Sequence, residues 1–242
     1  MSGHSKWATI KRAKETKDAK RGTVFTKLGN NISIAARTGG DPEANFSLRL
    51  AVERAKQANM PKENIERAIK RGTGELGGAA IEELTYEGFG PAKAAFIIEA
   101  VTDNKNRTAS EIRHIFTKFN GSLGATNSVN WKFDHSGVIR VAIDQTKSFN
   151  FDELELELID NGAIDINKEA EGITIITSIP DLQKMKTFLD KKNIAVESAQ
   201  IEYLAKEVKE LSPTDQEKIG PFIDALDENN DVSNFYTDVA LG

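Results

Sequence analysis

The stretch GVIRVAI (residues 137–143) begins a region whose apolar pattern predicts strand, helix, strand, strand, helix, strand. The five segments that follow are FDELELELID (151–160), AIDINKEA (163–170), GITIITS (172–178), PDLQKMKTFLDKK (180–192) and AVESAQIEYL (195–204). This order is typical of the split βαβ arrangement. We therefore predict an α+β, ferredoxin-like domain over residues 135–202.

The chain before this domain predicts elements of another α+β unit. AAFIIEAVT (94–102) is a nearly continuous apolar strand, and KNRTASEIRHIFTKF (105–119) has the apolar spacing of a helix. SVNWKFD (128–134) alternates as a strand and is predicted to expose Val129, Trp131 and Phe133 on one side.

The tail of the chain predicts a capped helix and a last strand, SNFYTDV (233–239). This strand has no partner within the ferredoxin-like unit, so we expect it to return to the sheet of residues 80–132. The middle domain is then discontinuous, covering residues 80–134 and 203–242, and the ferredoxin-like domain is inserted in it.

The first part of the chain, residues 1–75, predicts a small helical domain. VFTKLGNNISIAAR (24–37) has apolar residues at helical spacing and is followed by two glycines. Asp41 predicts the N-cap of a second helix, with Pro42 at its first position. A third helix is expected to start near Pro61.

This third helix ends in Lys70, Arg71 and Gly72, which suit a helix C-terminus and its cap. Three short helices with a basic surface also keep a DNA-binding helix-turn-helix open. Because no series of Arg or Asn marks a recognition helix, the support for that motif is weak.

Charge divides the chain into a basic first part and an acidic remainder. The formal net charge of the 242 residues is −5. Residues 1–72 contain 16 Lys or Arg against 7 Asp or Glu, a net of +9, and residues 73–242 contain 16 against 30, a net of −14. Basic surfaces attract nucleic-acid phosphates, whereas acidic surfaces repel them. The pattern favours a nucleic-acid partner for the first part.

The stretch GHSKWATIKRAKETKDAKRG (3–22) concentrates this charge, with seven Lys or Arg against Glu15 and Asp18. After Trp7 and Ile10 its apolar residues are two alanines, so it has almost no core-facing stripe. A solvated helix face is the alternative interpretation. We predict an arm, extended or marginally helical, that becomes ordered on a polyanion.

Residues that carry enzymatic chemistry are sparse. The chain has no cysteine, which excludes disulfides, thiolate metal sites and cysteine nucleophiles. Its three histidines, His4, His114 and His135, lack metal-ligand spacing, and His114 is predicted to be structural. The acidic residues of 151–160 are expected to be the solvated side of a helix with a buried stripe. We predict no catalytic site, no metal and no cofactor.

A literal G-x-G-x-x-G is formed by Gly72, Gly74 and Gly77. A dinucleotide-binding fingerprint must follow a strand, whereas this one follows a predicted helix, so we expect a flexible linker. No window approaches the ~18 uncharged apolar residues of a membrane span. We predict a cytoplasmic protein with no membrane partner and no small-molecule substrate, and we leave its oligomeric state open.

Three segments closely resemble the YebC family, which includes the mitochondrial translational activator of cytochrome c oxidase. They are GHSKWATIKRAKETKDAKRGTVFTKL (3–28), YEGFGPAKAAFIIEAVTDNKNRTASEIRHIF (86–116) and NGSLGATNSVNWKFDHSG (120–137). The resemblance implies a non-enzymatic, three-domain protein with a helical first domain and two α+β domains. Asn127 stands where glycine is expected. Because the motif starts at residue 3, we expect a bacterial cytosolic member.

The resemblance also indicates nucleic-acid-binding residues in the basic opening. By match they are His4, Lys6, Trp7, Lys11, Lys14, Lys17, Lys20 and Arg21. The other basic residues of the same stretch, Arg12 and Lys27, complete the predicted set.

Two functions follow, and an enzyme is a distant third. In the first, the protein is a ribosome-associated translation factor that contacts ribosomal and transfer RNA and eases elongation at proline-rich stretches, with Trp7 stacking on an unpaired base. In the second, it is a DNA-binding transcriptional regulator, which needs base-edge contacts in a groove. The sequence shows phosphate-binding chemistry and no base reader, so we favour RNA.

Overall fold

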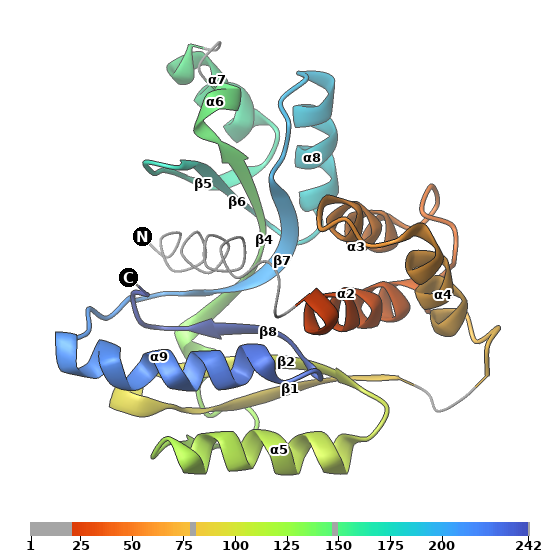
Figure 1. The fold of residues 1–242 in the computed structure, drawn as a ribbon. Coiled ribbons are helices and arrows are strands. Elements are labelled where there is room, and N and C mark those ends of the chain that lie inside the picture. Colours follow the sequence, from red (N-terminus) through yellow and green to blue (C-terminus); the bar gives the residue numbers. More distant parts are fainter. Residues whose placement is uncertain (1–20, 78–80, 147–149, 242) are drawn as a thin grey trace.

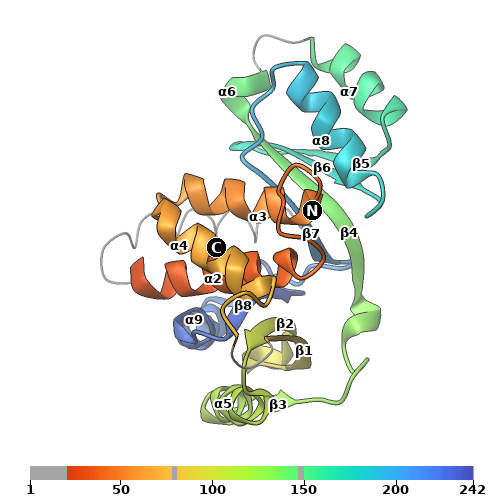
Figure 2. The ribbon, with the colours of Figure 1, turned by 90° about the vertical axis from the view of Figure 1, so that its right-hand side faces the viewer.

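A computed structural model describes residues 21–77, 81–146 and 150–241, without the side chains of Arg21 and Thr146. The chain forms a helical part (residues 21–77) and two antiparallel sheets, each with its own helices (Figures 1 and 2). In Figure 1 the first sheet lies at the bottom, the second at the top, and the helical part to the right. The predicted mixed α+β class, with helices first, is confirmed.

The first sheet, sheet A, has the strand order β3-β1-β2-β8. Its strands are β1 (Glu82–Phe89), β2 (Ala95–Thr102), β3 (Ser122–Leu123) and β8 (Val232–Thr237), and each neighbouring pair is antiparallel. The last strand pairs with β2 across more than a hundred residues of sequence, as its lack of a nearer partner predicted. Sequence analysis missed β1, whose residues are exposed at the glutamate-rich start and buried only near the end.

Two helices cover one face of sheet A. They are α5 (Lys105–Lys118) and α9 (Pro213–Glu228), and a short 3-10 turn, η1 (Pro91–Lys93), joins β1 to β2. Phe222 of α9 lies at the centre of this core, with its ring centroid 4.9 Å from that of Phe96 and 5.1 Å from that of Phe116. Such edge-to-face packing is typical of close aromatic contacts.

The second sheet, sheet B, has the strand order β5-β6-β4-β7. Its strands are β4 (Phe133–Ala142), β5 (Ala163–Lys168), β6 (Gly172–Thr177) and β7 (Ser198–Ala205). The helices between them are α6 (Ile143–Thr146), α7 (Phe151–Asp160) and α8 (Leu182–Lys191). All neighbouring strands are antiparallel, which is the split βαβ arrangement expected from the sequence.

The strands β4 and β6 have two distinct faces. Ile139 and Val141 of β4, with Ile173 and Ile175 of β6, pack in one core with α7 and α8. Side chains alternate along a strand, so the residues between them lie on the opposite face. We call this opposite side the open face; its residues include Val138, Arg140, Thr174, Gln200 and Glu202. Figure 2 shows α7 and α8 above sheet B, with the helical part and sheet A below it.

The two sheets are joined by the first half of β4 and the last half of β7. Phe133 pairs with Ala205 in this ladder. Phe133 and Val129 are buried together with Ala95, Ile97 and Tyr236 of sheet A. The second face of sheet A is therefore also covered, partly by this ribbon.

The helical part consists of α2 (Arg21–Ala36), α3 (Phe46–Gln57) and α4 (Lys62–Gly72). Its core contains Leu28, Ile32, Leu48, Val52 and Ile65. In addition, α2 packs on β2 and β8, and α3 packs on β7. The helical part therefore touches both sheets.

The predicted N-cap of α3 is wrong. The cap is Asn45, whose side-chain oxygen accepts a hydrogen bond from the Leu48 amide, and the helix begins at Phe46. Asp41 instead closes a separate turn, since its carboxylate accepts from the Glu43 amide and its carbonyl from the Asn45 amide. The Asn45 amide nitrogen also donates to the Ala35 carbonyl, which ties this turn to the end of α2.

Gly72 has a different role from the predicted cap. It is the last residue of α4, and Thr73 is the C-cap. A Cβ atom at Gly72 would lie 2.2 Å from the Ser33 carbonyl oxygen and 2.8 Å from the Ala36 Cβ. The glycine therefore allows α4 to approach the backbone of α2 closely.

The predicted strand over 128–134 is also wrong. Residues Asn130–Lys132 form a 3-10 turn, η2, and β4 starts only at Phe133. Val129 and Phe133 are buried, whereas Trp131 between them is 66% exposed, so the three side chains do not share a face. The acidic helix α7 has the buried stripe expected, through Leu154 and Leu158, but Ile159 is exposed.

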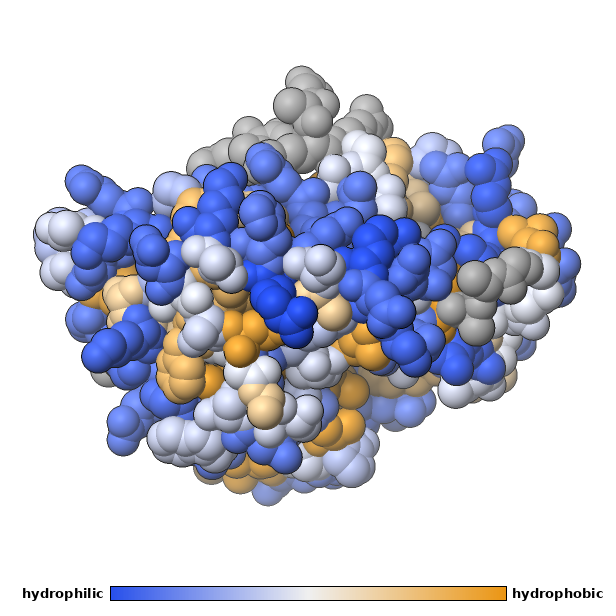
Figure 3. Space-filling view, turned by 90° about the horizontal axis from the view of Figure 1, so that it is seen from below, coloured by the Kyte–Doolittle hydropathy of each residue, from blue (hydrophilic) through white to orange (hydrophobic). Residues whose placement is uncertain are grey.

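The lower face of the molecule, on the side of α5, is mostly hydrophilic. Figure 3 shows small, separate apolar areas among polar residues on this face. Large exposed apolar patches often mark protein interfaces, and this face shows none.

Candidate nucleic-acid interface

Most of the predicted nucleic-acid-binding residues lie outside the described residues. This applies to His4, Lys6, Trp7, Lys11, Arg12, Lys14, Lys17 and Lys20. Arg21 is the first residue of α2, and only its backbone is described. Lys27 lies on α2, is partly buried, and already has an interaction partner. The assignment of the basic arm as the binding site therefore stays a prediction.

The described helical part adds exposed cations that the sequence analysis did not single out. Residues 21–77 contain ten Lys or Arg against six Asp or Glu. The side chains of Lys56, Arg67 and Lys70 are exposed. Arg67 and Lys70 are three residues apart on α4 and therefore lie on one side of it. Their exposure follows from the inward direction of Ile65 and Ala68, which a charge count does not reveal.

Arg71 of the same helix has a structural role. Its Nε donates to the Ser33 hydroxyl at 3.1 Å, and its Nη2 donates to the Asn30 side-chain oxygen at 2.6 Å. Asn30 in turn donates to the Val101 carbonyl in sheet A. Burial lowers the pKa of Arg71, and the nearby Asp103 carboxylate partly opposes this effect. Arg71 thus fastens α4 to α2 and, through Asn30, to sheet A.

A second contact fixes the helical part to sheet B. Arg54 of α3 donates to the Gln200 side chain of β7 at 3.0 Å. Lys186 of α8 lies 3.5 Å from the Glu53 carboxylate of α3. Through these contacts the exposed cations of α4 and the start of α2 are held in a defined position relative to the acidic body.

A buried ion pair lies on the open face beside these contacts. Arg140 and Glu202 form a two-pronged pair with N–O distances of 2.6 and 2.9 Å. Burial opposes the charge of Arg140, but the Glu202 carboxylate outweighs it, and the pKa of Arg140 is raised. Removing one partner of such a pair would leave an uncompensated buried charge.

The glycine-rich loop that precedes β4 is organised by a buried carboxylate. Glu87 accepts hydrogen bonds from the backbone amides of Asn127, Val129 and Asn130 at 2.7 to 2.9 Å. Asn127 has φ of 66°, a left-handed conformation that asparagine tolerates better than most residues. The asparagine found in place of the expected glycine therefore preserves the loop.

The described residues show no cluster typical of an enzyme centre. Among them, no group of three or more His, Asp or Glu side chains is placed to hold a metal ion. His114 is exposed on α5, so its predicted structural role is wrong; it lies one position beyond the buried stripe of Ile112 and Phe116. His135 stacks on Tyr203 at 4.2 Å, and burial lowers its pKa. Within the described ranges, no helix is long and apolar enough to cross a membrane.

Comparison with protein families places this architecture. The model of the TACO1/YebC protein N-terminal domain matches residues 5–75, and that of the TACO1/YebC second and third domain matches residues 81–239. The chain belongs to the TACO1/YebC family. The resemblance found in the sequence motifs is confirmed.

Relatives within the TACO1/YebC family match over their whole length. A probable transcriptional regulatory protein of Thermoanaerobacter pseudethanolicus is 51% identical, with 100% of this chain and 98% of the relative covered. One of the same description from Caldanaerobacter subterraneus subsp. tengcongensis is also 51% identical, with 100% and 99% covered. The crystal structure of a conserved hypothetical protein from Aquifex aeolicus has a TM-score of 0.81 at 41% identity, covering 92% of this chain and 91% of that one.

Proposed function

We propose that this TACO1/YebC protein is a non-enzymatic, nucleic-acid-binding regulator of gene expression that works on the ribosome. In this role it contacts ribosomal and transfer RNA and eases elongation at proline-rich stretches. The observation that carries the proposal is the separation of charge, +9 over residues 1–72 against −14 over residues 73–242. Phosphates attract the first part and repel the second, so an RNA surface engages the protein from one end.

The binding residues we propose are the basic arm and the start of α2. Trp7 supplies a stacking surface for an unpaired base, and the lysines and arginines of the arm neutralise phosphates. The exposed Arg67 and Lys70 of α4 extend the basic surface on the helical part. In this proposal the protein is cytoplasmic and uses no cofactor, metal or small-molecule substrate.

A second candidate is a DNA-binding transcriptional regulator. The descriptions of the relatives as probable transcriptional regulatory proteins favour it. Sequence-specific regulators place a helix or strand in a groove and read base edges there. The exposed cations of α4 suit phosphate contacts equally well, so the two candidates differ in the reader and not in the charge.

Sedimentation of ribosomes from cell lysate tests the proposal. We expect the unaltered chain in ribosomal fractions at low salt, and its release at high salt because the contacts are ionic. Lys11→Glu with Lys14→Glu should abolish the association. The matched control is Lys184→Glu with Lys191→Glu, which makes the same change of charge at exposed positions of α8 and should leave the association intact.

A translation reporter with consecutive proline codons provides the functional readout. We expect the arm variant to lose the protein's effect on this reporter, and the α8 variant to retain it. Absence of the unaltered chain from ribosomal fractions at low salt, together with tight binding to one duplex DNA sequence, would favour the regulator of transcription instead.

A further inference from the structure

The open face of sheet B is buried although its described neighbours leave it uncovered. Arg140, Thr174 and Glu202 are each at most 1% exposed. In the described ranges the main contacts of β6 are with β4, β5 and α6, and those of β4 are with β6, β7, α6, α8 and η2. The helices α2 to α4 and α9 are not among these main neighbours. A further part of the chain is needed to explain the burial.

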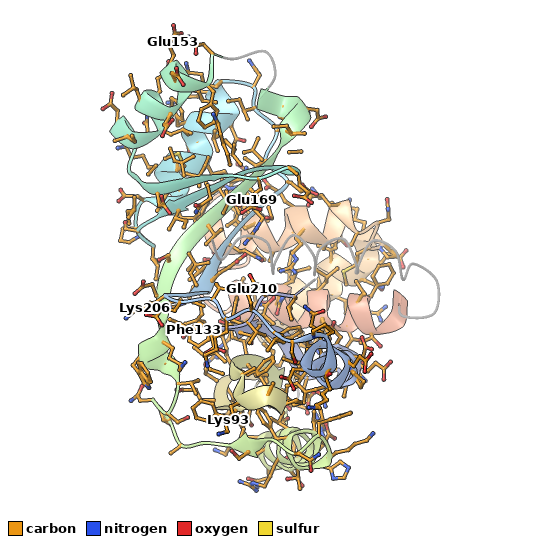
Figure 4. The ribbon with its side chains drawn as sticks, turned by 90° about the vertical axis from the view of Figure 1, so that its left-hand side faces the viewer. Lys93, Phe133, Glu153, Glu169, Lys206 and Glu210 are labelled. Carbon is orange, nitrogen blue, oxygen red and sulfur yellow. The ribbon has the colours of Figure 1, made fainter. Side chains whose placement is uncertain are left out.

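The surface that needs a cover is rich in carboxylates. Glu169 and Glu202 act on Arg140, and Glu99 and Glu202 act on Tyr236, so the five groups form one electrostatic cluster. We name these five residues the concave cluster. Figure 4 shows Glu169 in the sheet B part of the molecule, above the junction marked by Phe133 and Lys206. The cluster thus combines three carboxylates with one guanidinium.

The polar atoms of this cluster extend from sheet B to sheet A. The Tyr236 hydroxyl of β8 donates to the Glu99 carboxylate of β2 at 3.1 Å, and Asn234 donates to the same carboxylate at 3.0 Å. The Nε of Arg140 is buried without a hydrogen-bond acceptor among the described residues. Burial together with Glu99 and Glu202 raises the pKa of Tyr236 well above its ordinary value. An acidic environment of this kind favours a cationic cover.

The chain supplies such a cover from its own N-terminus. Residues 1–20 contain six Lys or Arg against Glu15 and Asp18, a net of +4. The segment is attached at Arg21, the first residue of α2, and α2 packs on the strands β2 and β8 that carry Glu99 and Tyr236. Twenty residues span about 30 Å even as a helix, roughly the diameter of a small domain.

We propose that the concave cluster and the open face form the docking surface of the chain's own basic segment, residues 1–20. The docked segment pairs its lysines and arginines with Glu99, Glu169 and Glu202 and covers Thr174 and Val138. In the free protein the acidic body thereby holds the same cations that a polyanion would bind. The docking itself does not depend on the proposed role on the ribosome.

A spin label on the segment tests the docking in the full chain without nucleic acid. The chain has no cysteine, so Ala13→Cys accepts a single label without changing the charge of the segment. We expect an immobilised line shape at low salt and a mobile one at high salt, because salt screens ion pairs between partly exposed groups. A label that is already mobile at low salt would overturn the proposal.

Two substitutions show whether the immobilised label reports this surface. Glu169→Gln and Glu99→Gln keep the shape of the side chain and remove one charge each. Each should raise the mobile fraction about two- to fivefold, the range for losing one ion pair. Glu153→Gln at the far end of α7 is the matched control and should leave the line shape unchanged (Figure 4).

If Glu169→Gln and Glu99→Gln behave like the Glu153→Gln control, the segment is held elsewhere and the proposal is wrong. Thermal unfolding of each variant confirms that the fold is retained before the line shapes are compared. Ribosome sedimentation of the same labelled chains is scored separately. A failure of docking with intact sedimentation therefore leaves the proposed function in place, and the reverse result leaves the docking in place.

Discussion

Sheet A and sheet B differ in how their two faces are covered. Sheet A has a core under α5 and α9 on one face and a second core with Phe133 and Val129 on the other. Sheet B has α7 and α8 on one face and polar, buried residues on the open face. The strand β2, at the centre of sheet A, is therefore almost continuously apolar, with Glu99 as its single charged residue.

The charged residues inside these buried strands have a common location. Glu99 interrupts β2, and Arg140 lies between Ile139 and Val141 of β4. Both belong to the concave cluster between the sheets. A charged residue within a buried strand thus marks the side on which the parts of this molecule meet.

The most drastic way to break the comparison is to remove sheet B. We propose that it is a domain inserted in the middle one, as the boundaries 135–202 predict. His135 and Tyr203 face each other across the β4–β7 ladder, so a short Asn-Gly turn can join them after residues 136–202 are deleted. We expect the remainder to unfold cooperatively on heating, because sheet A keeps both helices of its main core. A gradual, non-cooperative transition would reject the insertion.

A single aromatic ring in sheet A should have the next largest effect. Phe222→Ala removes a ring that contacts Phe96, Phe116 and Phe119. We expect a loss of about 3–5 kcal/mol in the free energy of unfolding, measured with denaturant, since a large buried side chain leaves a cavity. Ile164→Ala is the control; Ile164 is 69% exposed on β5, and its truncation should cost less than about 0.5 kcal/mol.

On the open face of sheet B, the loss should come from charge and not from a cavity. Glu202→Ala leaves Arg140 buried and unpaired, and we expect a cost of about 3 kcal/mol in the free energy of unfolding. The double variant Arg140→Met with Glu202→Leu replaces both charges by apolar groups and should recover most of that loss. Equal destabilisation of the single and double variants would show that packing, and not the unpaired charge, is responsible.

A smaller effect is expected where the helices contact each other. Gly72→Ala would place a Cβ atom 2.2 Å from the Ser33 carbonyl oxygen, so the helices must separate. We expect a cost of about 1–3 kcal/mol, the range for overpacking. Gly220→Ala in α9 is the matched control: a Cβ atom added there would meet nothing within 4 Å, and the substitution should stabilise by about 0.4–1 kcal/mol. Opposite signs for the two variants are the result that sharpens the contrast.

The sequence predicted the regular elements of sheet B because their apolar residues follow one period over each segment. Prediction failed where tertiary contacts decide the conformation. Asn45 and not Asp41 caps α3, since only Asn45 can also reach the Ala35 carbonyl. Trp131 lies in a turn because Glu87, far away in sequence, binds the amides of the two residues before it.

The candidate site was less predictable than the fold. Charge counting indicated the basic arm, which lies outside the described residues, but not which cations of the helical part are exposed. Arg71 and Lys70 are neighbours in sequence, yet Arg71 binds Asn30 and Ser33 while Lys70 is exposed. The concave cluster was not predicted at all, because its members come from five strands or their ends, and no local pattern connects them.

The smallest effect we expect is a pH dependence at the junction of the sheets. His135 stacks on Tyr203 with an interplanar angle of 6°, and burial lowers its pKa. The unfolded chain then binds the proton at a higher pH than the folded chain. The contribution to stability is therefore complete above the ordinary pKa of about 6.5, and it falls as the pH is lowered through the window between that value and the pKa of the folded state.

Denaturant unfolding at pH 7.5 and 5.5 measures this effect, and His135→Phe is the matched variant. The phenylalanine keeps a ring against Tyr203 but cannot take up a proton. Carboxylates such as Asp134, which is paired with Lys206 at 3.6 Å, are common to both proteins and cancel in the comparison. We expect the unaltered chain to lose more stability than the variant between the two pH values. An equal loss in both would mean that the proton is accommodated at the junction without cost, and that the stacked pair does not oppose protonation of His135.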